Sequence, residues 1–239
     1  MALFAKRIFL VTGASGGVGE AIARRLGDNG ATVWLSGRNL RRLDRLAEQL
    51  PTRRGRPIPG DLTVEDEFQK VVRQVMARPG HLDGIIHCAA TISLASFATA
   101  SKEDFEKQFG INVLVPFRLT QLLLPALTSS KGLVVFINST AGRTALADVG
   151  QYAATKHALR ALADSLRDEC NAAGVRVCSI FLGSTATSMQ AAVRAKQKRA
   201  YHPERLIQPD DVAQMVSGIL ALPQTAEVTD IIMRPTVKA

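Results

Sequence analysis

The sequence contains few cysteines, and they show no pairing pattern. Cys88, Cys170 and Cys178 are the three present, and none belongs to a CxxC pair. An odd number of scattered cysteines indicates neither a disulfide framework nor a metal motif, and the histidines have no partners at metal-ligand spacing. We therefore expect a reduced, cytoplasmic protein without a bound metal ion.

Long apolar runs and an aromatic-rich basic surface are also lacking. No stretch of about 18 uncharged apolar residues could span a bilayer, and residues 1–6 lack the pattern of a signal peptide, so we expect no membrane association. Aromatic residues make up 5% of the chain, and no zinc spacing or basic zipper accompanies the net charge of +9. Nucleic-acid binding is thus supported by net charge alone, and we do not expect it.

What the chain does contain is enough apolar material for one large domain. Hydrophobic residues make up 46% and charged residues 21% of the 239 residues, which is ordinary for a globular protein. No repeat or low-complexity linker divides the chain, and single α/β sheets reach this length. We therefore expect one domain over 1–239.

Apolar runs and helical periodicities alternate along the whole chain. Strands are expected at 8–11, 31–36, within 51–59, and at 82–88, 132–138, 175–182 and 228–233. A first helix is expected directly after the first strand, with Ile22, Ala23 and Leu26 buried. Further helices are expected at 40–50, from the N-cap Thr63 through Met76, and at 101–127, 151–173 and 209–222. We expect Gly174 to cap the helix at 151–173. This alternation predicts an α/β fold of Rossmann type, a doubly wound parallel sheet of about seven strands in three α/β/α layers, with ligands at the carboxyl ends of the strands.

Residues 12–19, with the sequence TGASGGVG, join the first expected strand to the first expected helix. A glycine-rich turn at this position leaves backbone N–H groups at the positive end of a helix, where a pyrophosphate binds. We expect Gly13 to allow the tight turn, Gly17 to let phosphates approach, and Gly19 to let the helix pack closely on the strand. Glycines also mark ordinary turns, but a strand before and a helix after are the context that a dinucleotide-binding turn requires.

With this layout, the sequence is similar to the short-chain dehydrogenase/reductase family in its compact single-domain form. The resemblance covers nearly the whole chain and rests on the glycine-rich turn, Asp61, Asn112, Ser139 and the segment from Tyr152 to Lys156, YAATK. It implies an enzyme that transfers a hydride between a nicotinamide cofactor and a carbonyl or secondary alcohol. It also implies that Ser139, Tyr152, Lys156 and Asn112 are the catalytic residues.

Tyr152 and Lys156 are four residues apart, so on a helix they share one face. A nearby ammonium group favours the phenolate, and lowering the pKa of a phenol from about 10 to about 7 requires roughly 4 kcal/mol of differential stabilisation. In the family this tyrosine gives a proton to the carbonyl oxygen, and the lysine also holds the nicotinamide ribose. We therefore expect Lys156 to acidify Tyr152.

The other two catalytic candidates have alternatives. Ser139 follows a predicted strand at the carboxyl end of the sheet, where its hydroxyl could orient a substrate carbonyl; Thr140 could do the same, and the resemblance favours Ser139. Asn112 lies in the middle of a predicted helix, an unfavourable place for asparagine. The resemblance implies that Asn112 holds a water molecule in a proton relay, and a solvent-facing Asn112 is the alternative.

The end of the second expected strand indicates which nicotinamide cofactor binds. Residues 35–39, LSGRN, offer no carboxylate to the ribose 2′-hydroxyl of NAD, whereas the Arg38 guanidinium suits the 2′-phosphate of NADP. We predict NADP(H), and we assign most of the other arginines between 41 and 56 to a solvated face. The expected cofactor-binding residues, most of them implied by the resemblance, are Gly13, Ser15, Gly16, Gly17, Val18, Gly19, Arg38, Asp61, Leu62, Ala89, Tyr152, Lys156, Gly183, Thr185 and Thr187.

Three segments depart from the family pattern and leave the substrate open, one of them being residues 233–236, MRPT, in place of the usual glycine-rich end. After the fourth strand the family usually has Asn-Asn-Ala-Gly, where this chain has HCAA at 87–90, and Leu182-Gly183 replaces a Pro-Gly. We expect His87 to supply a substitute hydrogen bond. The segment around 184–208 corresponds to the family's mobile lid over the substrate. Its basic residues could attract an anionic substrate such as a thioester carrier, although a charge run is usually a solvated face; they are Arg194, Lys196, Lys198 and Arg199.

The sequence thus predicts an NADP(H)-dependent oxidoreductase that acts on a small carbonyl or alcohol substrate, a ketone or a 3-ketoacyl-type compound. The alternative is a nucleotide-binding regulatory or scaffold protein with a relic site, for which the altered 87–90 segment is the reason. The family implies a homodimer or homotetramer. Apolar residues beyond one narrow stripe of the expected helix 101–127, at 117, 119 and 122–124, support such contacts.

Overall fold

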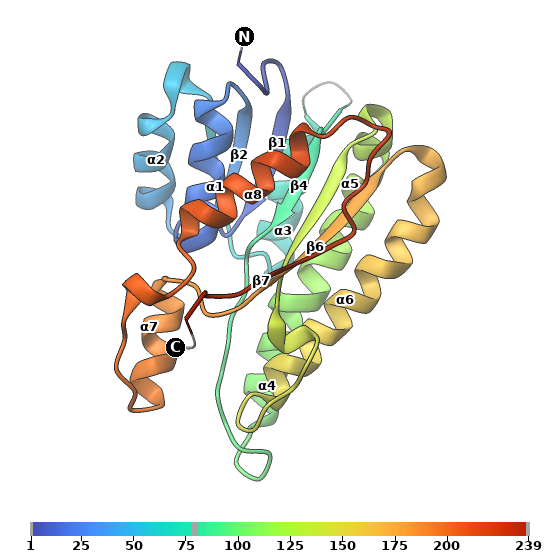
Figure 1. The fold of residues 1–239 in the computed structure, drawn as a ribbon. Coiled ribbons are helices and arrows are strands. Elements are labelled where there is room, and N and C mark those ends of the chain that lie inside the picture. Colours follow the sequence, from blue (N-terminus) through green and yellow to red (C-terminus); the bar gives the residue numbers. More distant parts are fainter. Residues whose placement is uncertain (1, 78–80, 238–239) are drawn as a thin grey trace.

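The computed structural model describes residues 2–77 and 81–237, and these form one parallel sheet of seven strands. The strand order is β3-β2-β1-β4-β5-β6-β7 (Figure 1), the doubly wound order with one further strand. The predicted fold class is confirmed. Residues 1, 78–80 and 238–239 of the expected domain lie outside the described part. The strands are β1 (Ile8–Thr12), β2 (Thr32–Gly37), β3 (Gly55–Pro59), β4 (Gly84–His87), β5 (Leu133–Ser139), β6 (Arg176–Leu182) and β7 (Asp230–Met233).

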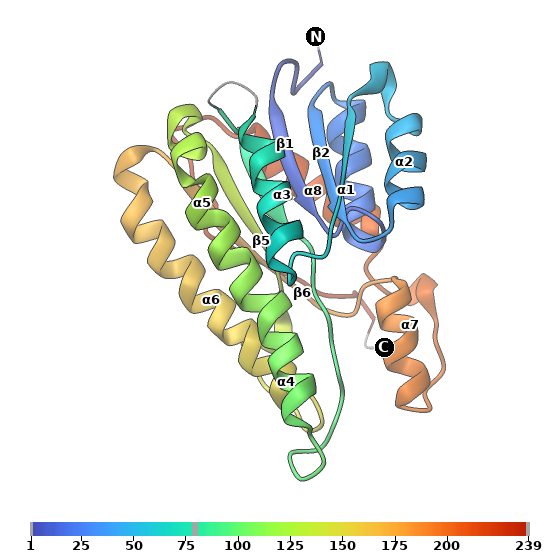
Figure 2. The same cartoon turned by 180° about the vertical axis from the view of Figure 1, so that it is seen from behind.

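Helices cover both faces of the sheet (Figures 1 and 2). One face carries α1 (Gly17–Asp28), α2 (Leu40–Gln49) and α8 (Pro209–Ala221). The other carries α3 (Glu65–Met76), α5 (Val115–Ser130) and α6 (Gly150–Cys170). Two more helices, α4 (Lys102–Phe109) and α7 (Ser188–Lys196), lie beyond the carboxyl ends of the strands. Short 3₁₀ turns occupy Pro51–Arg53, Thr140–Gly142, Asn171–Ala173 and Pro203–Arg205.

The central strands are buried on both faces, which explains why they appear in the sequence as continuous apolar runs. Every residue of β6 and all of β4 are buried. Helices pack on them through single apolar stripes, as in α1, where Ile22, Ala23 and Leu26 are buried as predicted. The register sets Thr12 opposite His87 and Ser139 opposite Leu182, so the ends of four strands share one edge.

The helix expected over 101–127 is not uniform, because a π-helical turn interrupts it. The segment Gly110–Leu114 forms this turn between α4 and α5. Pro116 has no backbone N–H to donate to the carbonyl four residues earlier, which disfavours a regular α-helix at this point. Asn112 lies in the middle of the turn and is buried. The prediction of an unbroken α-helix is therefore wrong at its centre.

Two other element ends depart from expectation. Thr63 is not the N-cap of α3, because that helix begins at Glu65 with Val64 in the cap position. The Thr63 N–H and hydroxyl instead donate to the Asp61 carboxylate at 3.0 and 2.6 Å. The last strand begins at Asp230 rather than 228. Gly174 adopts the left-handed conformation, with φ of 82°, as a cap after the 3₁₀ turn that follows α6.

The helical stretch Lys102–Ser130 contains an 18-residue window with a mean hydropathy of 1.4, which by length and composition alone is enough to cross a membrane. Half of this 18-residue window is buried inside the protein. Leu119, Leu123 and Leu127 pack in the core between this stretch and the sheet. We therefore assign the stretch to the protein core.

Candidate active site

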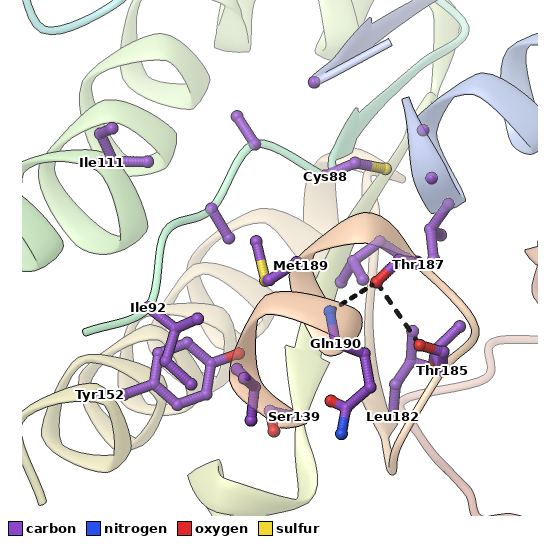
Figure 3. A pocket seen from close by; sticks show the side chains of 18 of the residues that line it. Cys88, Ile92, Ile111, Ser139, Tyr152, Leu182, Thr185, Thr187, Met189 and Gln190 are labelled. Atoms are coloured by element: carbon purple, nitrogen blue, oxygen red, sulfur yellow. Dashed lines mark hydrogen bonds between the residues drawn. The ribbon is translucent and has the colours of Figure 1, made fainter. Parts of the chain in front are cut away.

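A cavity of about 660 Å³ opens where the carboxyl ends of the strands meet α7 and the start of α6 (Figure 3). Every residue predicted to bind the cofactor lines this cavity, and so does Ser139. Asn112 is the only predicted site residue that does not reach the wall. Residues from both halves of the chain thus meet at the edge of the sheet where a parallel α/β fold binds ligands.

The glycine-rich turn forms the wall beside α1. Gly13 has φ of +67°, and a Cβ atom there would lie 2.8 Å from the Ala89 nitrogen, so the turn needs glycine. A Cβ atom on Gly19 would collide with the Gly13 carbonyl, which agrees with the predicted close packing of α1 on the end of β1. The Thr12 hydroxyl accepts hydrogen bonds from the Cys88 and Ala89 N–H groups at 3.1 and 3.2 Å. The loops after β1 and β4 are therefore fixed together around the start of α1.

Two arginines stand beside the glycine-rich turn. Arg38 Nη1 lies 4.0 Å from an Asp61 carboxylate oxygen. Arg42 Nη1 lies 3.8 Å from the place a Cβ atom on Gly16 would take, and no acidic side chain pairs with Arg42 in the described part of the chain. Arg42 is not among the site residues expected from the sequence; the signal that could have indicated it is its place four residues after Arg38, in the first turn of the helix that follows β2. Both guanidinium groups line the cavity.

Asp61 is the only acidic side chain among the described residues that line the cavity. Partial burial alone would raise the pKa of this carboxyl, but hydrogen bonds from Thr63 and the charge of Arg38 outweigh burial and lower it. Asp61 is therefore ionised at neutral pH and remains a hydrogen-bond acceptor.

Ser139, Tyr152 and Lys156 converge at the floor of the cavity. Ser139 is the last residue of β5, and Tyr152 and Lys156 lie in the first two turns of α6. The Tyr152 hydroxyl points toward Ser139 (Figure 3), and the two side chains are hydrogen-bonded. Thr140 also lines the cavity, but the hydrogen bond to Tyr152 comes from Ser139.

Lys156 is buried, with 2% of its surface exposed. Its Nζ donates a hydrogen bond to the Ile137 carbonyl at 3.0 Å, and burial lowers the pKa of Lys156 to about 8. The Asn138 amide donates to the Lys156 carbonyl at 3.1 Å and accepts from the Ser139 N–H at 2.7 Å. Asn138, which the sequence analysis missed, thus fixes the end of β5 against α6; a polar residue at the end of an apolar strand was the signal.

The expectation that Lys156 acidifies Tyr152 is wrong for this structure. Burial raises the pKa of Tyr152 to about 12, and the hydrogen bond with Ser139 opposes this only in part. Lys156 Nζ lies 5.8 Å from the centre of the Tyr152 ring and is directed to Ile137 instead. The phenol is therefore protonated at neutral pH, which is the form that can give a proton to a carbonyl oxygen.

Asn112 is buried, with 1% of its surface exposed, so the solvent-facing alternative is wrong. Its amide oxygen accepts from the Thr91 N–H at 2.9 Å, and its amide nitrogen donates to the Thr91 carbonyl at 2.9 Å and to the Thr155 hydroxyl at 3.0 Å. The Thr155 hydroxyl in turn donates to the Tyr152 carbonyl at 2.8 Å. Asn112 thus holds the segment after β4 against the helix that carries Tyr152.

His87 forms a side-chain hydrogen bond, as expected, and its partner is a residue of the helix α5. Its Nε2 lies 2.8 Å from the Thr120 hydroxyl on α5, and its ring stacks on Phe136 of β5 with centroids 5.0 Å apart. Burial lowers the pKa of His87 to about 3, so the ring is neutral at physiological pH. Cys88 and Ala90 line the cavity beside it, and burial raises the pKa of the Cys88 thiol.

The helix α7 covers one side of the cavity. A Cβ atom on Gly17 would lie 3.1 Å from the Thr187 methyl group, so the start of α7 stands directly against the glycine-rich turn. The Thr187 hydroxyl caps α7 by accepting from the Gln190 N–H at 3.2 Å. Of the four basic residues noted in this segment, Arg194 and Arg199 line the cavity, whereas Lys196 and Lys198 are exposed outside it.

Comparison with known proteins identifies the family. The sequence pattern of the short chain dehydrogenase family matches residues 7–198. An uncharacterized oxidoreductase of Staphylococcus epidermidis is 29% identical over 236 residues, which cover 98% of this chain and 100% of that protein.

Solved structures agree with this assignment. An alcohol dehydrogenase of the archaeon Thermococcus sibiricus, complexed with 5-hydroxy-NADP, matches with a TM-score of 0.88, 26% identity and 98% coverage of both chains. A short chain dehydrogenase of Escherichia coli CFT073, complexed with NADPH, matches with a TM-score of 0.87, 30% identity and coverage of 97% of this chain and 98% of that one. Because the family pattern spans most of the sequence and the whole fold agrees, this chain belongs to the short-chain dehydrogenase family of oxidoreductases.

Proposed function

We propose that this protein is an NADP(H)-dependent carbonyl reductase that works in reverse as an alcohol dehydrogenase, on a ketone or 3-ketoacyl-type substrate. The observation that carries the proposal is the meeting of Ser139, Tyr152 and Lys156 on the same cavity that the glycine-rich turn lines. A bound nicotinamide cofactor supplies or accepts the hydride.

The residues around the cavity fit an NADP(H) molecule. At the start of α1 the backbone is so closely packed at Gly13 that a side chain there would collide with it. A glycine-lined helix N-terminus of this kind suits a pyrophosphate. Arg38 and Arg42 place two guanidinium groups beside the turn, and Asp61 is the single carboxylate near them. The resulting excess of positive charge suits a 2′-phosphate. The complexes of related proteins with NADP(H) support this choice.

We assign the remaining cofactor contacts along the cavity wall. Asp61 and Leu62 contact the adenine, Ala89 the ribose beside the nicotinamide, and the loop after β6 the nicotinamide and pyrophosphate through Gly183, Thr185 and Thr187. Lys156 holds the nicotinamide ribose.

In this proposal the proton comes from Tyr152. Its phenol, kept protonated by burial, donates to the carbonyl oxygen of the substrate, and Ser139 orients both groups through hydrogen bonds. Lys156, with a pKa of about 8, can release a proton to restore the phenol near neutral pH. Asn112 fixes Thr91 and Thr155 and keeps one lone pair of its amide oxygen for a relay water.

The test is transfer of deuterium from NADPH deuterated at the nicotinamide C4 to a panel of ketones, aldehydes and ketoacyl thioesters. The proposal predicts a deuterated alcohol, which mass spectrometry detects. The alternative of a nucleotide-binding regulatory or scaffold protein finds support in the raised pKa of Tyr152 and the altered 87–90 segment. Tight NADPH binding with no transfer to any member of the panel would favour that alternative.

The proposal extends to location and assembly. Cys88, Cys170 and Cys178 are free thiols, which supports a reducing cytoplasm, and we propose no nucleic-acid or membrane partner. A homodimer or homotetramer finds support in apolar side chains exposed along α4, the π-helical turn and α5, and light scattering on the purified protein tests it. These side chains are Phe105, Phe109, Leu114, Phe117 and Leu122.

A further inference from the structure

Around Tyr152 the walls of the cavity are apolar on three sides. The segment after β4 contributes Ile92 and Leu94, the segment before α6 contributes Leu146 and Val149, and α7 contributes Met189 and Val193. Leu94 is buried, whereas 71% of Leu146 and 39% of Met189 are exposed, so the latter two offer apolar surface that nothing in the described structure covers.

Lys156 is the charged group nearest Tyr152, and its ammonium nitrogen donates a hydrogen bond to the Ile137 carbonyl. Arg38 and Arg42 stand at the glycine-rich turn, where Arg38 Nη1 lies 4.0 Å from an Asp61 carboxylate oxygen. Asp61 is the only acidic side chain among the described residues that line the cavity. Ser139 and Tyr152 offer hydrogen bonds to a substrate carbonyl at the other end.

The helix α7 carries its apolar and its polar side chains on different faces. Successive residues of a helix are about 100° apart and residues four apart share a face, so Met189 and Val193 form one stripe and Gln190, Arg194 and Gln197 the next. In Figure 3, Met189 projects to the side on which Ile92 and Cys88 lie, whereas Gln190 lies on the side of Thr185 and Leu182. The polar stripe, with Arg194, therefore follows the loop after β6, which we assign to the cofactor.

We propose that the substrate is a neutral lipophilic ketone, or the matching secondary alcohol, with apolar groups on both sides of the carbonyl carbon, and that Met189 and Ile92 determine this specificity. The inference rests on the proposed reductase function: a hydride from NADPH adds to the carbonyl carbon, a proton from Tyr152 adds to the oxygen, and NADP⁺ and the alcohol result. A carboxylate or phosphate against Met189 and Ile92 would lose its hydration to apolar side chains, and the Lys156 ammonium is already hydrogen-bonded to the Ile137 carbonyl.

The first test compares two ketones that differ only by a charge. Acetophenone and 4-acetylbenzoate carry the same aryl methyl ketone, and the second adds a carboxylate on the ring. We expect kcat/KM with NADPH to be at least about tenfold higher for acetophenone, since moving a charge from water against apolar side chains is costly. Equal or higher kcat/KM for 4-acetylbenzoate would overturn the inference.

The second test changes the apolar stripe and uses a matched methionine as the control. Met189→Lys puts a charge at the Tyr152 end, whereas Met215→Lys puts the same charge on α8, away from this cavity; 39% of Met189 and 38% of Met215 are exposed. We expect Met189→Lys to lower kcat/KM for acetophenone about tenfold or more with unchanged NADPH affinity, and Met215→Lys to resemble the wild type. Equal activity of Met189→Lys and Met215→Lys on acetophenone would contradict the assigned role.

A binding measurement separates failure of this inference from failure of the proposed function. Calorimetric titration of the NADP⁺-loaded wild type and Met189→Lys with acetophenone and with 4-acetylbenzoate measures binding alone, because NADP⁺ has no hydride to give to a ketone. Selective binding of acetophenone that Met189→Lys weakens, without hydride transfer from NADPH to any ketone, would contradict the reductase proposal and support the apolar specificity. Equal binding of both ketones would contradict the inference whether or not the protein is a reductase.

Discussion

The Lys156 ammonium nitrogen lies 5.8 Å from the centre of the Tyr152 ring, yet its hydrogen bond goes to the Ile137 carbonyl at 3.0 Å. Burial therefore acts on each group separately: it raises the pKa of Tyr152 to about 12 and lowers that of Lys156 to about 8. Both groups are shifted toward their neutral forms, the direction expected where water is excluded. The Tyr152 phenol is therefore protonated at neutral pH and holds a proton to donate, although it is a weaker acid than a phenol with a pKa near neutrality.

Replacing Lys156 by methionine should raise stability at neutral pH. Because the pKa of Lys156 falls from 10.5 to about 8 on folding, the folded protein binds this proton more weakly than the unfolded chain does. The group therefore costs stability below pH 8, and that cost disappears as the pH rises toward 10.5. We expect Lys156→Met to be more stable than the wild type by about 1–3 kcal/mol at pH 7, with the difference shrinking toward pH 10.

Urea unfolding of both proteins between pH 7 and pH 10 measures this difference. Lys70→Met, at an exposed lysine of α3, is the control and should show no such trend. A difference between Lys156→Met and the wild type that stays constant over this pH range would refute the assigned cost of burial.

Arg38→Ala and Arg42→Ala should each weaken NADPH binding by about 10- to 100-fold, because each would remove a charge-assisted hydrogen bond to the 2′-phosphate. NADH affinity should stay unchanged, since that cofactor has no 2′-phosphate. Arg45→Ala is the matched control, because Arg45 is an exposed arginine of α2 that does not line the cavity. Fluorescence titration measures all three variants, and equal losses for NADPH and NADH would count against a 2′-phosphate site.

Asn112→Leu should destabilise the protein by about 2–4 kcal/mol, because it leaves the half-buried N–H and carbonyl of Thr91 without their Asn112 partner. Thr155→Val removes a single bond from Asn112 and should cost less, about 1 kcal/mol. Thermal and urea unfolding check both values. Asn112→Leu with wild-type stability would show that Asn112 does not hold this segment.

Features that depend on local spacing could be predicted from the sequence. The glycine-rich turn, the Tyr152 and Lys156 pair and Ser139 at the end of an apolar strand were all recognisable, because each depends on a few adjacent residues and on the strand-helix alternation. Their meeting on one cavity follows from parallel topology, which gathers the carboxyl ends of strands at one edge.

Features that depend on distant partners could not be predicted. Asn112 looked unfavourable in a helix because its partner, Thr91, lies in an irregular segment 21 residues away, and a π-helical turn turns it inward. Thr63 matched the sequence pattern of an N-cap, but its hydroxyl donates a hydrogen bond to the Asp61 carboxylate instead of capping α3. The pKa of Tyr152 was expected to fall because spacing reveals the nearby lysine, whereas it does not reveal how much water the folded site excludes.

The most direct test of the account is a single-turnover measurement of Tyr152→Phe, which keeps the ring and removes only the hydroxyl. With saturating NADPH and excess acetophenone, we predict a rate of NADPH oxidation about 10²- to 10⁴-fold below that of the wild type, the usual contribution of a general acid. Oxidation of NADPH by the variant at nearly the wild-type rate would contradict the claim that Tyr152 donates the proton.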